Sequence, residues 1–197
     1  IHAASQASPN FYGIDPIGTL KANTIGTLNL LELAEKNKVE SFLYFSSSEI
    51  YGQVDVDISE NDYGIVNPML VRSCYVRNVV NNQNIKIRSD GTARRAFCYV
   101  SDATIAFFKV LLEGDPGDVY NVGNPKEEFS ILELAESLSK MFSEKQIKVV
   151  KEGIKNNYIK STVSRSLPNI DKLGKLNWEP MISVEQGFKR TINYYNE

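Results

Sequence analysis

The sharpest change from apolar to polar residues along the chain lies at residues 42–49. Four large apolar residues in a row, at positions 42–45, predict a strand that is buried on both faces, as in a parallel sheet. Three hydroxyls and a carboxylate follow at positions 46–49. In open parallel α/β sheets the ligand crevice lies outside the carboxyl ends of the strands, so these polar side chains are candidates for chemistry. A polar loop that simply meets water is an equally good alternative.

A helix is predicted before this strand. Residues 20–37 place Ile25, Leu28, Leu31 and Ala34 at three-residue steps, which is the apolar stripe of an amphipathic helix. Residues 1–5 are interpreted as the end of an earlier strand, and residues 41–48 as the next one. Strand, helix and strand in this order predict a right-handed βαβ crossover.

Shorter elements are predicted in the rest of the chain. Further strands are expected at 85–87, 97–100, 119–122 and 146–151. Ser101 or Asp102 is expected to cap a helix. Two capping boxes, each a Ser followed three residues later by Glu or Gln, predict helices that begin after Ser130 and Ser183.

Composition excludes several classes of function. The chain has 197 residues and a formal net charge of −2, so its charge does not indicate the basic surface that binds nucleic acid. Cys74 and Cys98 form neither a disulfide framework nor a metal-binding spacing, which favours a reducing, cytoplasmic location and predicts no metal site. No apolar run reaches membrane-spanning length, so no membrane partner is expected. His2 is interpreted as a structural histidine at a strand end, and Trp178 as a core residue.

Six motifs occur in an order that is specific, although each one alone is weak. They are His2-Ala3-Ala4-Ser5, KANTIGTLN at 21–29, SSSEIYG at 46–52, RAFCYVSD at 95–102, YNVGNP at 120–125 and LNWEP at 176–180. Through these motifs the chain resembles, nearly from end to end, the extended short-chain dehydrogenase/reductase family of nucleotide-sugar epimerases, dehydratases and decarboxylases.

The resemblance implies an α/β fold, a Rossmann-like doubly wound parallel sheet with a smaller C-terminal substrate-binding domain. Residues 1–122 would be the remainder of the NAD-binding domain and residues 123–197 the nucleotide-sugar domain, with residues 81–94 open to either assignment. The family generally dimerises through its cofactor-domain helices. We therefore expect a homodimer through the helix at 20–37, with its Leu-rich face buried and residues 35–40 exposed.

The resemblance also assigns NAD as cofactor. The residues matched to NAD binding are Ala3, Ala4, Ser5, Ala22, Asn23, Ser46 and Tyr75. Ser47 matches the residue that hydrogen-bonds the 4-hydroxyl of the sugar, and Tyr75 matches the tyrosine base of a Tyr-x-x-x-Lys pair. A phenol with a pKa of about 10 needs a neighbouring cation to act as that base. Here the fourth position after the tyrosine is Val79.

A glycine-rich loop, which would receive the pyrophosphate of NAD at a helix N-terminus, is also absent. One explanation covers both absences: the sequence starts partway through the cofactor domain and joins Tyr75 to Val76 across several dozen omitted residues. A degenerate protein that cannot hold NAD is the alternative. We favour the omission, because every retained motif is intact.

Ser48 and Glu49 decide which family member the chain resembles most. The 4,6-dehydratases carry Asp-Glu at these positions, and the 4-epimerases generally lack the carboxylate, whereas UDP-glucuronate decarboxylases (UDP-xylose synthases) are similar at both. The catalytic set implied is therefore Ser47, Ser48, Glu49 and Tyr75. A 4,6-dehydratase acting on dTDP-glucose and a UDP-sugar 4-epimerase remain alternatives within the family.

The mechanism implied is redox-neutral. NAD⁺ takes hydride from C4 of UDP-glucuronate, the resulting β-keto acid loses CO₂, and protonation at C5 and hydride return to C4 give a UDP-pentose. The residues implied in substrate binding are Lys21, Asn29, Arg95 and Arg165. A guanidinium fork can bind phosphate or carboxylate, but a surface salt bridge is the plain alternative for Arg95, as an exposed helix position is for Lys21.

Three classes of function therefore stay open. The first is the nucleotide-sugar enzyme. The second is a nucleotide-sugar-binding protein without catalysis, which a true absence of the lysine and the glycine loop would indicate. The third is an interaction module without a ligand, and the polar end of the strand at 41–48 argues against it.

Overall fold

The computed structural model describes residues 1–3, 14–47, 51, 58, 75–87, 89–152 and 164–196. Its helices are α2 (Pro16–Lys21), the π-helix η1 (Ala22–Gly26), α3 (Thr27–Lys36), α4 (Tyr75–Val80), α5 (Val100–Glu113), α6 (Ile131–Met141), the 3₁₀-helix η3 (Ser143–Lys145), α7 (Asp171–Gly174) and α8 (Val184–Tyr194). Its strands are β1 (Ile85–Ile87), β2 (Arg94–Ala96), β3 (Glu128–Ser130), β4 (Val149–Lys151) and β5 (Arg165–Ser166). None of the described helices is long and apolar enough to cross a membrane.

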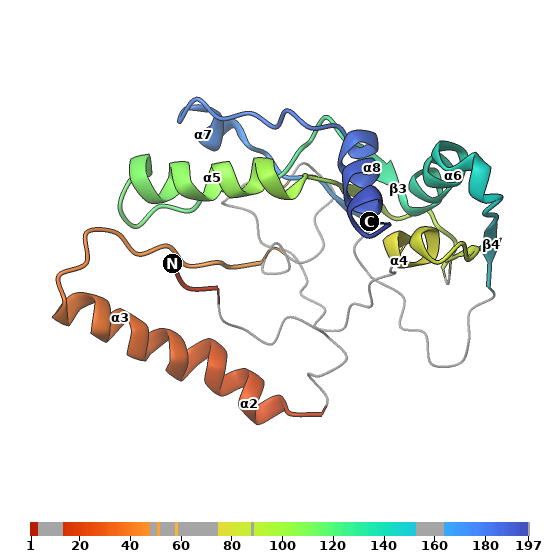
Figure 1. Ribbon diagram of the computed structural model, residues 1–197. Helices are drawn as coiled ribbons and strands as arrows, with labels where there is room; N and C mark the ends of the chain where they lie inside the picture. The colour runs from red at the N-terminus through yellow and green to blue at the C-terminus, as the bar shows by residue number, and fades with distance from the viewer. Residues whose placement is uncertain are drawn as a thin grey trace.

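The N-terminal part has the predicted strand–helix–strand order, but the two strands are reduced to a single parallel β-bridge. His2 and Tyr44 are paired in parallel, with hydrogen bonds from His2 N to Leu43 O (2.7 Å) and from Phe45 N to His2 O (3.0 Å). One continuous helix, α2–η1–α3, connects the two strand ends (Figure 1). It begins at Pro16 rather than at residue 20, because the Asp15 side chain caps it by accepting a hydrogen bond from Gly18 N and proline suits the first helical position.

The strand at 42–45 is less buried than the sequence predicts. Phe42, Leu43 and Phe45 are only half-buried, and Tyr44 is 48% exposed. The reason is that this strand has a described strand neighbour on one side alone, the His2 side. On its faces, α2 and α3 lie on one side and α5 on the other (Figure 1). On the α5 side, the Phe45 and Phe107 rings pack edge to face, with 4.5 Å between their centroids.

The apolar stripe of α3 is exposed in the single chain, so the burial of its Leu-rich face in a homodimer stays a prediction. Leu28, Leu31 and Leu33 are 54%, 46% and 55% exposed. Residues 35–40 are exposed as expected. An apolar stripe of this kind normally packs on a core or a partner, and the described residues supply no partner for it.

The C-terminal part is built on two small sheets. In one, β1 and β4 pair in parallel. In the other, β2 lies between β3, which is antiparallel to it, and β5, which is parallel to it. The main core packs α4, β1, α6 and α8 together, with Val79, Ile85, Leu138 and Ile192 fully buried. The strand predicted at 97–100 is displaced to Arg94–Ala96, because helix α5 already begins at Val100, and residues 119–122 form no regular strand.

Asp102 does not cap α5, and neither does Ser101. The N-cap is Tyr99, which makes no side-chain capping hydrogen bond. The buried carboxylate of Asp102 instead accepts hydrogen bonds from Met181 N (2.9 Å) and Ile182 N (2.8 Å). Its carbonyl oxygen accepts one from Trp178 Nε1 (3.0 Å). Asp102 thereby holds the 178–182 segment against α5. Ala106, Leu173 and Trp178 form a second core there, which confirms Trp178 as a core residue.

Both predicted capping boxes are present. The Ser130 hydroxyl accepts from Glu133 N while the Glu133 carboxylate accepts from Ser130 N. Ser183 and Gln186 do the same at the start of α8. These are local patterns in which the side chains satisfy helix donors from within four residues, so the sequence alone specifies them.

We predict that Gly123→Ala destabilises the fold by about 1–3 kcal/mol, the usual cost of overpacking. Gly123 is buried, and an added Cβ would lie 2.4 Å from Pro168 Cγ, a rigid ring that cannot move aside. Gly174→Ala is the matched control, since nothing lies within 4 Å of its added Cβ. Urea denaturation of both variants checks this. Equal stability of the two would contradict the packing argument.

Candidate functional site

The candidate site lies at the carboxyl ends of the two N-terminal strands. Because His2 and Tyr44 pair in parallel, the chain leaves both strands at the same edge. Ala3 follows His2 there, and Ser46 and Ser47 follow the second strand. All three are exposed. The edge therefore presents two hydroxyls and a small side chain to a ligand.

His2 fixes the connecting helix to this edge. Its Nε2 lies 3.0 Å from Thr27 Oγ1, and the Thr27 hydroxyl donates to Asn23 O (2.9 Å). Since the only hydroxyl proton of Thr27 is used in that bond, His2 Nε2 is the donor and carries the ring proton. The His2 ring is buried and contacts the rings of Phe42 and Tyr44. This confirms the interpretation of His2 as structural.

Asn23 and Ala22 lie in the π-helical segment η1, one turn before Thr27. Short π-helical segments are frequent at functional sites, because they present side chains at an unusual angle. Both residues are exposed, as are Lys21 and Asn29 on the same helix. The hydrogen bond between His2 and Thr27 thus brings the helix turn of Asn23 and the strand ends into one region.

Ala4, Ser5, Ser48 and Glu49 lie outside the described residues. Tyr75 begins α4 and is buried in the main core with Val79 and Ile85.

Arg165 and Arg95 lie on the three-stranded sheet. Arg165 donates to both carboxylate oxygens of Glu128, at 2.7 Å from Nε and 3.3 Å from Nη2. Arg95 Nη1 donates to Arg94 O (2.6 Å). The guanidinium of Arg165 therefore already holds a carboxylate in the way it would hold a phosphate.

The same sheet carries two charged residues that sequence reasoning missed, Arg94 and Glu128. Arg94 Nε lies 3.3 Å from Glu128 Oε1, and its Nη1 lies 3.1 Å from Glu133 Oε2. The hydrogen bond from Arg165, with the charges of Arg165 and Arg94, holds the pKa of Glu128 below its ordinary value. The pairing of Glu128 with the two arginines depends on β2 lying between β3 and β5, and no local sequence pattern predicts that strand order.

We predict that Glu128→Gln destabilises the protein at neutral pH and that the difference shrinks in acid. Because the folded-state pKa of Glu128 is lowered from 4.5, its stabilising contribution is present above pH 4.5 and is lost as the pH falls through the lowered value. Denaturation curves from pH 7 to pH 3 measure the difference. Glu136→Gln, at an exposed position of α6, is the control. A difference that stays constant with pH would contradict the assignment.

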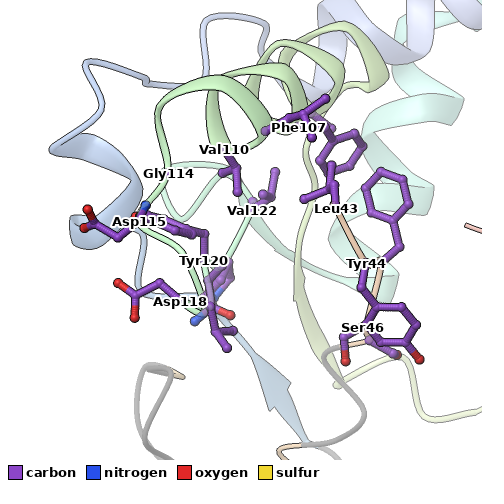
Figure 2. Close-up of a pocket in the computed structure, with 18 of the residues that line it drawn as sticks. Leu43, Tyr44, Ser46, Phe107, Val110, Gly114, Asp115, Asp118, Tyr120 and Val122 are labelled. Atoms are coloured by element: carbon purple, nitrogen blue, oxygen red, sulfur yellow. The ribbon is translucent and has the colours of Figure 1, made fainter. Parts of the chain in front are cut away.

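A large cleft adjoins the candidate site. Its volume is about 830 Å³, and it runs between residues 40–47 and residues 114–123 with α5 as its floor (Figure 2). Cys98 also lines it. Burial, with the nearby charge of Asp102, raises the pKa of the Cys98 thiol to about 11, so this thiol is protonated at neutral pH and is not a nucleophile. Among the described residues, no group of His, Cys, Asp and Glu side chains is arranged to hold a metal ion.

Comparison with known proteins gives a family match. The sequence model of the NAD dependent epimerase/dehydratase family matches residues 1–71 and, in a second piece, residues 68–123.

Curated relatives align over nearly the whole chain. UDP-glucuronic acid decarboxylase 6 of Arabidopsis thaliana is 30% identical over 94% of this chain and 66% of its own length. UDP-glucuronic acid decarboxylase 1 of Danio rerio is 32% identical over 99% of this chain and 56% of its own length. The chain thus spans somewhat less than two thirds of the first relative and just over half of the second.

Solved structures give the fold. The UDP-glucuronic acid 4-epimerase of Bacillus cereus, in complex with UDP-glucuronic acid and NAD, superposes with a TM-score of 0.83. It is 20% identical, and the match covers 99% of this chain and 74% of that one. This likeness confirms the predicted Rossmann-like α/β fold class.

Proposed function

Because the chain belongs to the NAD dependent epimerase/dehydratase family, we propose that it modifies a nucleotide sugar, by decarboxylation of UDP-glucuronate to UDP-xylose. The observation that carries the proposal is the shared strand edge, where Ala3, Ser46 and Ser47 emerge beside the helix turn of Asn23. Relatives named UDP-glucuronic acid decarboxylase support the choice of reaction. The family match confirms the resemblance found in the sequence and NAD as the predicted cofactor.

The edge fits the ribose side of a dinucleotide. Its donors are the exposed hydroxyls of Ser46 and Ser47 and the exposed amide of Asn23, which suit hydroxyl and amide partners, and Ala3 adds little bulk. In the proposal Ala3, Ala22, Asn23 and Ser46 hold NAD, which when bound supplies a hydride acceptor and donor. The His2–Thr27 hydrogen bond orients this set by fixing the helix to the strand end.

The sugar is proposed to lie beyond Ser47, whose hydroxyl hydrogen-bonds its 4-hydroxyl. Ser48 and Glu49 complete the proposed catalytic set at this edge, with the carboxylate of Glu49 beside C5. Tyr75 is the proposed base, although the structure buries it in the main core at the start of α4 rather than at this edge. Lys21 and Asn29 are proposed to reach the substrate from the helix, and Arg95 and Arg165 from the sheet. For Arg165 to bind a diphosphate, that ligand has to displace or join Glu128. The same proposal includes a boundary after residue 122 between the NAD-binding domain and the nucleotide-sugar domain, and a cytoplasmic location of the protein.

A second candidate is 4-epimerisation of the same sugar. It is favoured by the fold likeness to the Bacillus cereus UDP-glucuronic acid 4-epimerase. The two reactions share oxidation at C4 and differ in the fate of the carboxylate, so Ser48 and Glu49 are the positions expected to separate them.

The test is to supply the full gene product and NAD with UDP-glucuronate and, separately, with dTDP-glucose, and to identify the products by mass and by NMR, since a 4-epimer has the mass of its substrate. We expect CO₂ and a UDP-pentose from the first and no product from the second. A product of unchanged mass from UDP-glucuronate would favour the epimerase. Water loss from dTDP-glucose would favour a dehydratase, and no turnover of either would favour a binding protein.

We also propose that the protein is a homodimer that buries the exposed stripe of α3. Contiguous exposed apolar side chains of this kind mark interaction sites. Leu28→Glu is predicted to convert the dimer to a monomer, which light scattering measures. Glu35→Gln, outside the stripe, is the control and should remain dimeric. A monodisperse monomer for the unmodified full gene product would contradict the proposal.

A further inference from the structure

A chain of hydrogen bonds begins just after Ser47 in the sequence. Tyr51 lies four residues later and is buried, with 6% of its surface exposed. The Tyr51 hydroxyl lies 3.0 Å from the Asn121 side-chain oxygen, and Asn121 Nδ2 donates to Ile58 O at 3.1 Å. Asn121 thus holds both Tyr51 and Ile58, and these two bonds together are called the Asn121 link.

The direction of both bonds follows from the chemistry of the groups. The carbonyl oxygen of Ile58 can only accept, so the amide nitrogen of Asn121 faces Ile58 and its amide oxygen faces Tyr51. The Tyr51 hydroxyl is therefore the donor. Tyr51→Phe removes this donor and keeps the buried ring, whereas Asn121→Asp keeps the acceptor for Tyr51 and removes the donor to Ile58.

Ile58 connects the Asn121 link to the segment that carries Arg165. The N–H of Ile58 donates to Leu167 O and its carbonyl oxygen accepts from Asn169 N, both at 2.7 Å. Ile58 is accordingly paired in parallel with Pro168. Arg165 begins β5 only three residues before Pro168, so this end of the hydrogen-bonded chain lies next to β5.

The Asn121 link joins the two sides of the cleft. Figure 2 shows Ser46 on one side and Tyr120, the neighbour of Asn121, on the other. Tyr51 and Asn121 also line the cleft. Four residues of chain span at most about 14 Å, so the bond between Tyr51 and Asn121 limits where the Ser47 hydroxyl can lie.

We propose that Asn121 and Tyr51 are positioning residues that set the distance between the reacting hydroxyl of the sugar and its diphosphate. This inference rests on the proposed function, in which Ser47 bonds the 4-hydroxyl and Arg165 the diphosphate. Because the Asn121 link connects these two regions, a substrate held at both has to match the spacing that the link fixes. The Asn121 amide is bonded to Tyr51 and Ile58, so it acts through them. A misplacement of about 1 Å can lower a rate about 100-fold.

The kinetic test compares Tyr51→Phe with Tyr120→Phe in the full gene product. Each variant removes a phenolic hydroxyl that is hydrogen-bonded, since Tyr120 accepts from Asp115 N at 3.0 Å. Tyr51→Phe is expected to lower kcat with UDP-glucuronate about 10- to 100-fold, with a change in KM below about threefold. Tyr120→Phe should leave kcat unchanged. An unchanged kcat in Tyr51→Phe, or an equal loss in both variants, would overturn the proposal.

A double-variant cycle tests whether the two residues act as one unit. Tyr51→Phe and Asn121→Asp break successive bonds of the same link, so their combination should lower kcat no more than the larger single effect. Losses in kcat that multiply would mean that the two side chains act independently, which contradicts positioning through the Asn121 link.

Amide hydrogen exchange tests the Asn121 link without turnover. Asn121→Asp places a carboxylate against Ile58 O, so exchange at the Ile58 and Asn169 amides is expected to become about 10-fold faster, and Tyr120→Phe should leave it unchanged. Unchanged exchange in Asn121→Asp would overturn the proposal, whether or not the protein is active. An unmodified protein that turns over no nucleotide sugar would instead contradict the proposed function, so the two failures are distinguishable.

Discussion

Asp102→Ala is expected to destabilise the protein by about 3 kcal/mol or more. The carboxylate of Asp102 is buried and accepts the backbone N–H groups of Met181 and Ile182, and hydrogen bonds to a charged group contribute roughly 1.5–3 kcal/mol each. Alanine leaves both donors without an acceptor at the point where the 178–182 segment meets α5. Urea denaturation followed by the fluorescence of Trp178, the single tryptophan, measures the loss.

Two controls separate this effect from a general loss of negative charge. Asp102→Asn keeps an acceptor oxygen and should cost less than Asp102→Ala. Asp118→Ala removes a 41%-exposed carboxylate that pairs with Lys172 at 3.0 Å, and exposed pairs contribute about 0–1 kcal/mol. If Asp102→Ala and Asp118→Ala cost the same, Asp102 does not secure the segment.

Ser47→Ala is expected to lower the kcat of the full gene product about 100-fold or more with a smaller change in KM. The proposed role of the Ser47 hydroxyl is a hydrogen bond to the reacting 4-hydroxyl, which strengthens as charge develops on that oxygen. Loss of an interaction made mainly in the transition state lowers kcat. Steady-state kinetics with UDP-glucuronate measure the effect.

Ser101→Ala is the matched control, because Ser101 is an exposed serine at the start of α5 that does not line the cleft beside the candidate site. It should leave kcat unchanged. A rise in KM with unchanged kcat in Ser47→Ala would assign Ser47 to binding alone, and an active Ser47→Ala enzyme would remove it from the site.

Elements whose signals are local were predictable from the sequence. The capping boxes at Ser130 and Ser183 involve partners three residues apart, and both form. The strand–helix–strand unit also follows from local periodicity, and its parallel pairing places Ser46 and Ser47 at the predicted edge. The structural role of His2 follows from its place at a strand end.

Features that depend on distant partners were not predictable. Asp102 has the sequence context of a helix cap. Its carboxylate instead accepts hydrogen bonds from two backbone N–H groups almost 80 residues later. The burial expected at residues 42–45 needs a neighbour on each side of the strand, and the described structure supplies one. The pairing of Glu128 with Arg94 and Arg165 requires the strand order β3–β2–β5, which no local pattern indicates.

The proposed site depends on reversible oxidation at C4 of the sugar, and one isotope measurement tests this. UDP-glucuronate deuterated at C4 is converted by the NAD-loaded full gene product, and the product is analysed by mass and by NMR. We predict a UDP-pentose that has lost CO₂ and keeps its deuterium at C4, with no NADH accumulating. Deuterium lost to water, moved to another carbon or trapped in NADH would contradict the account.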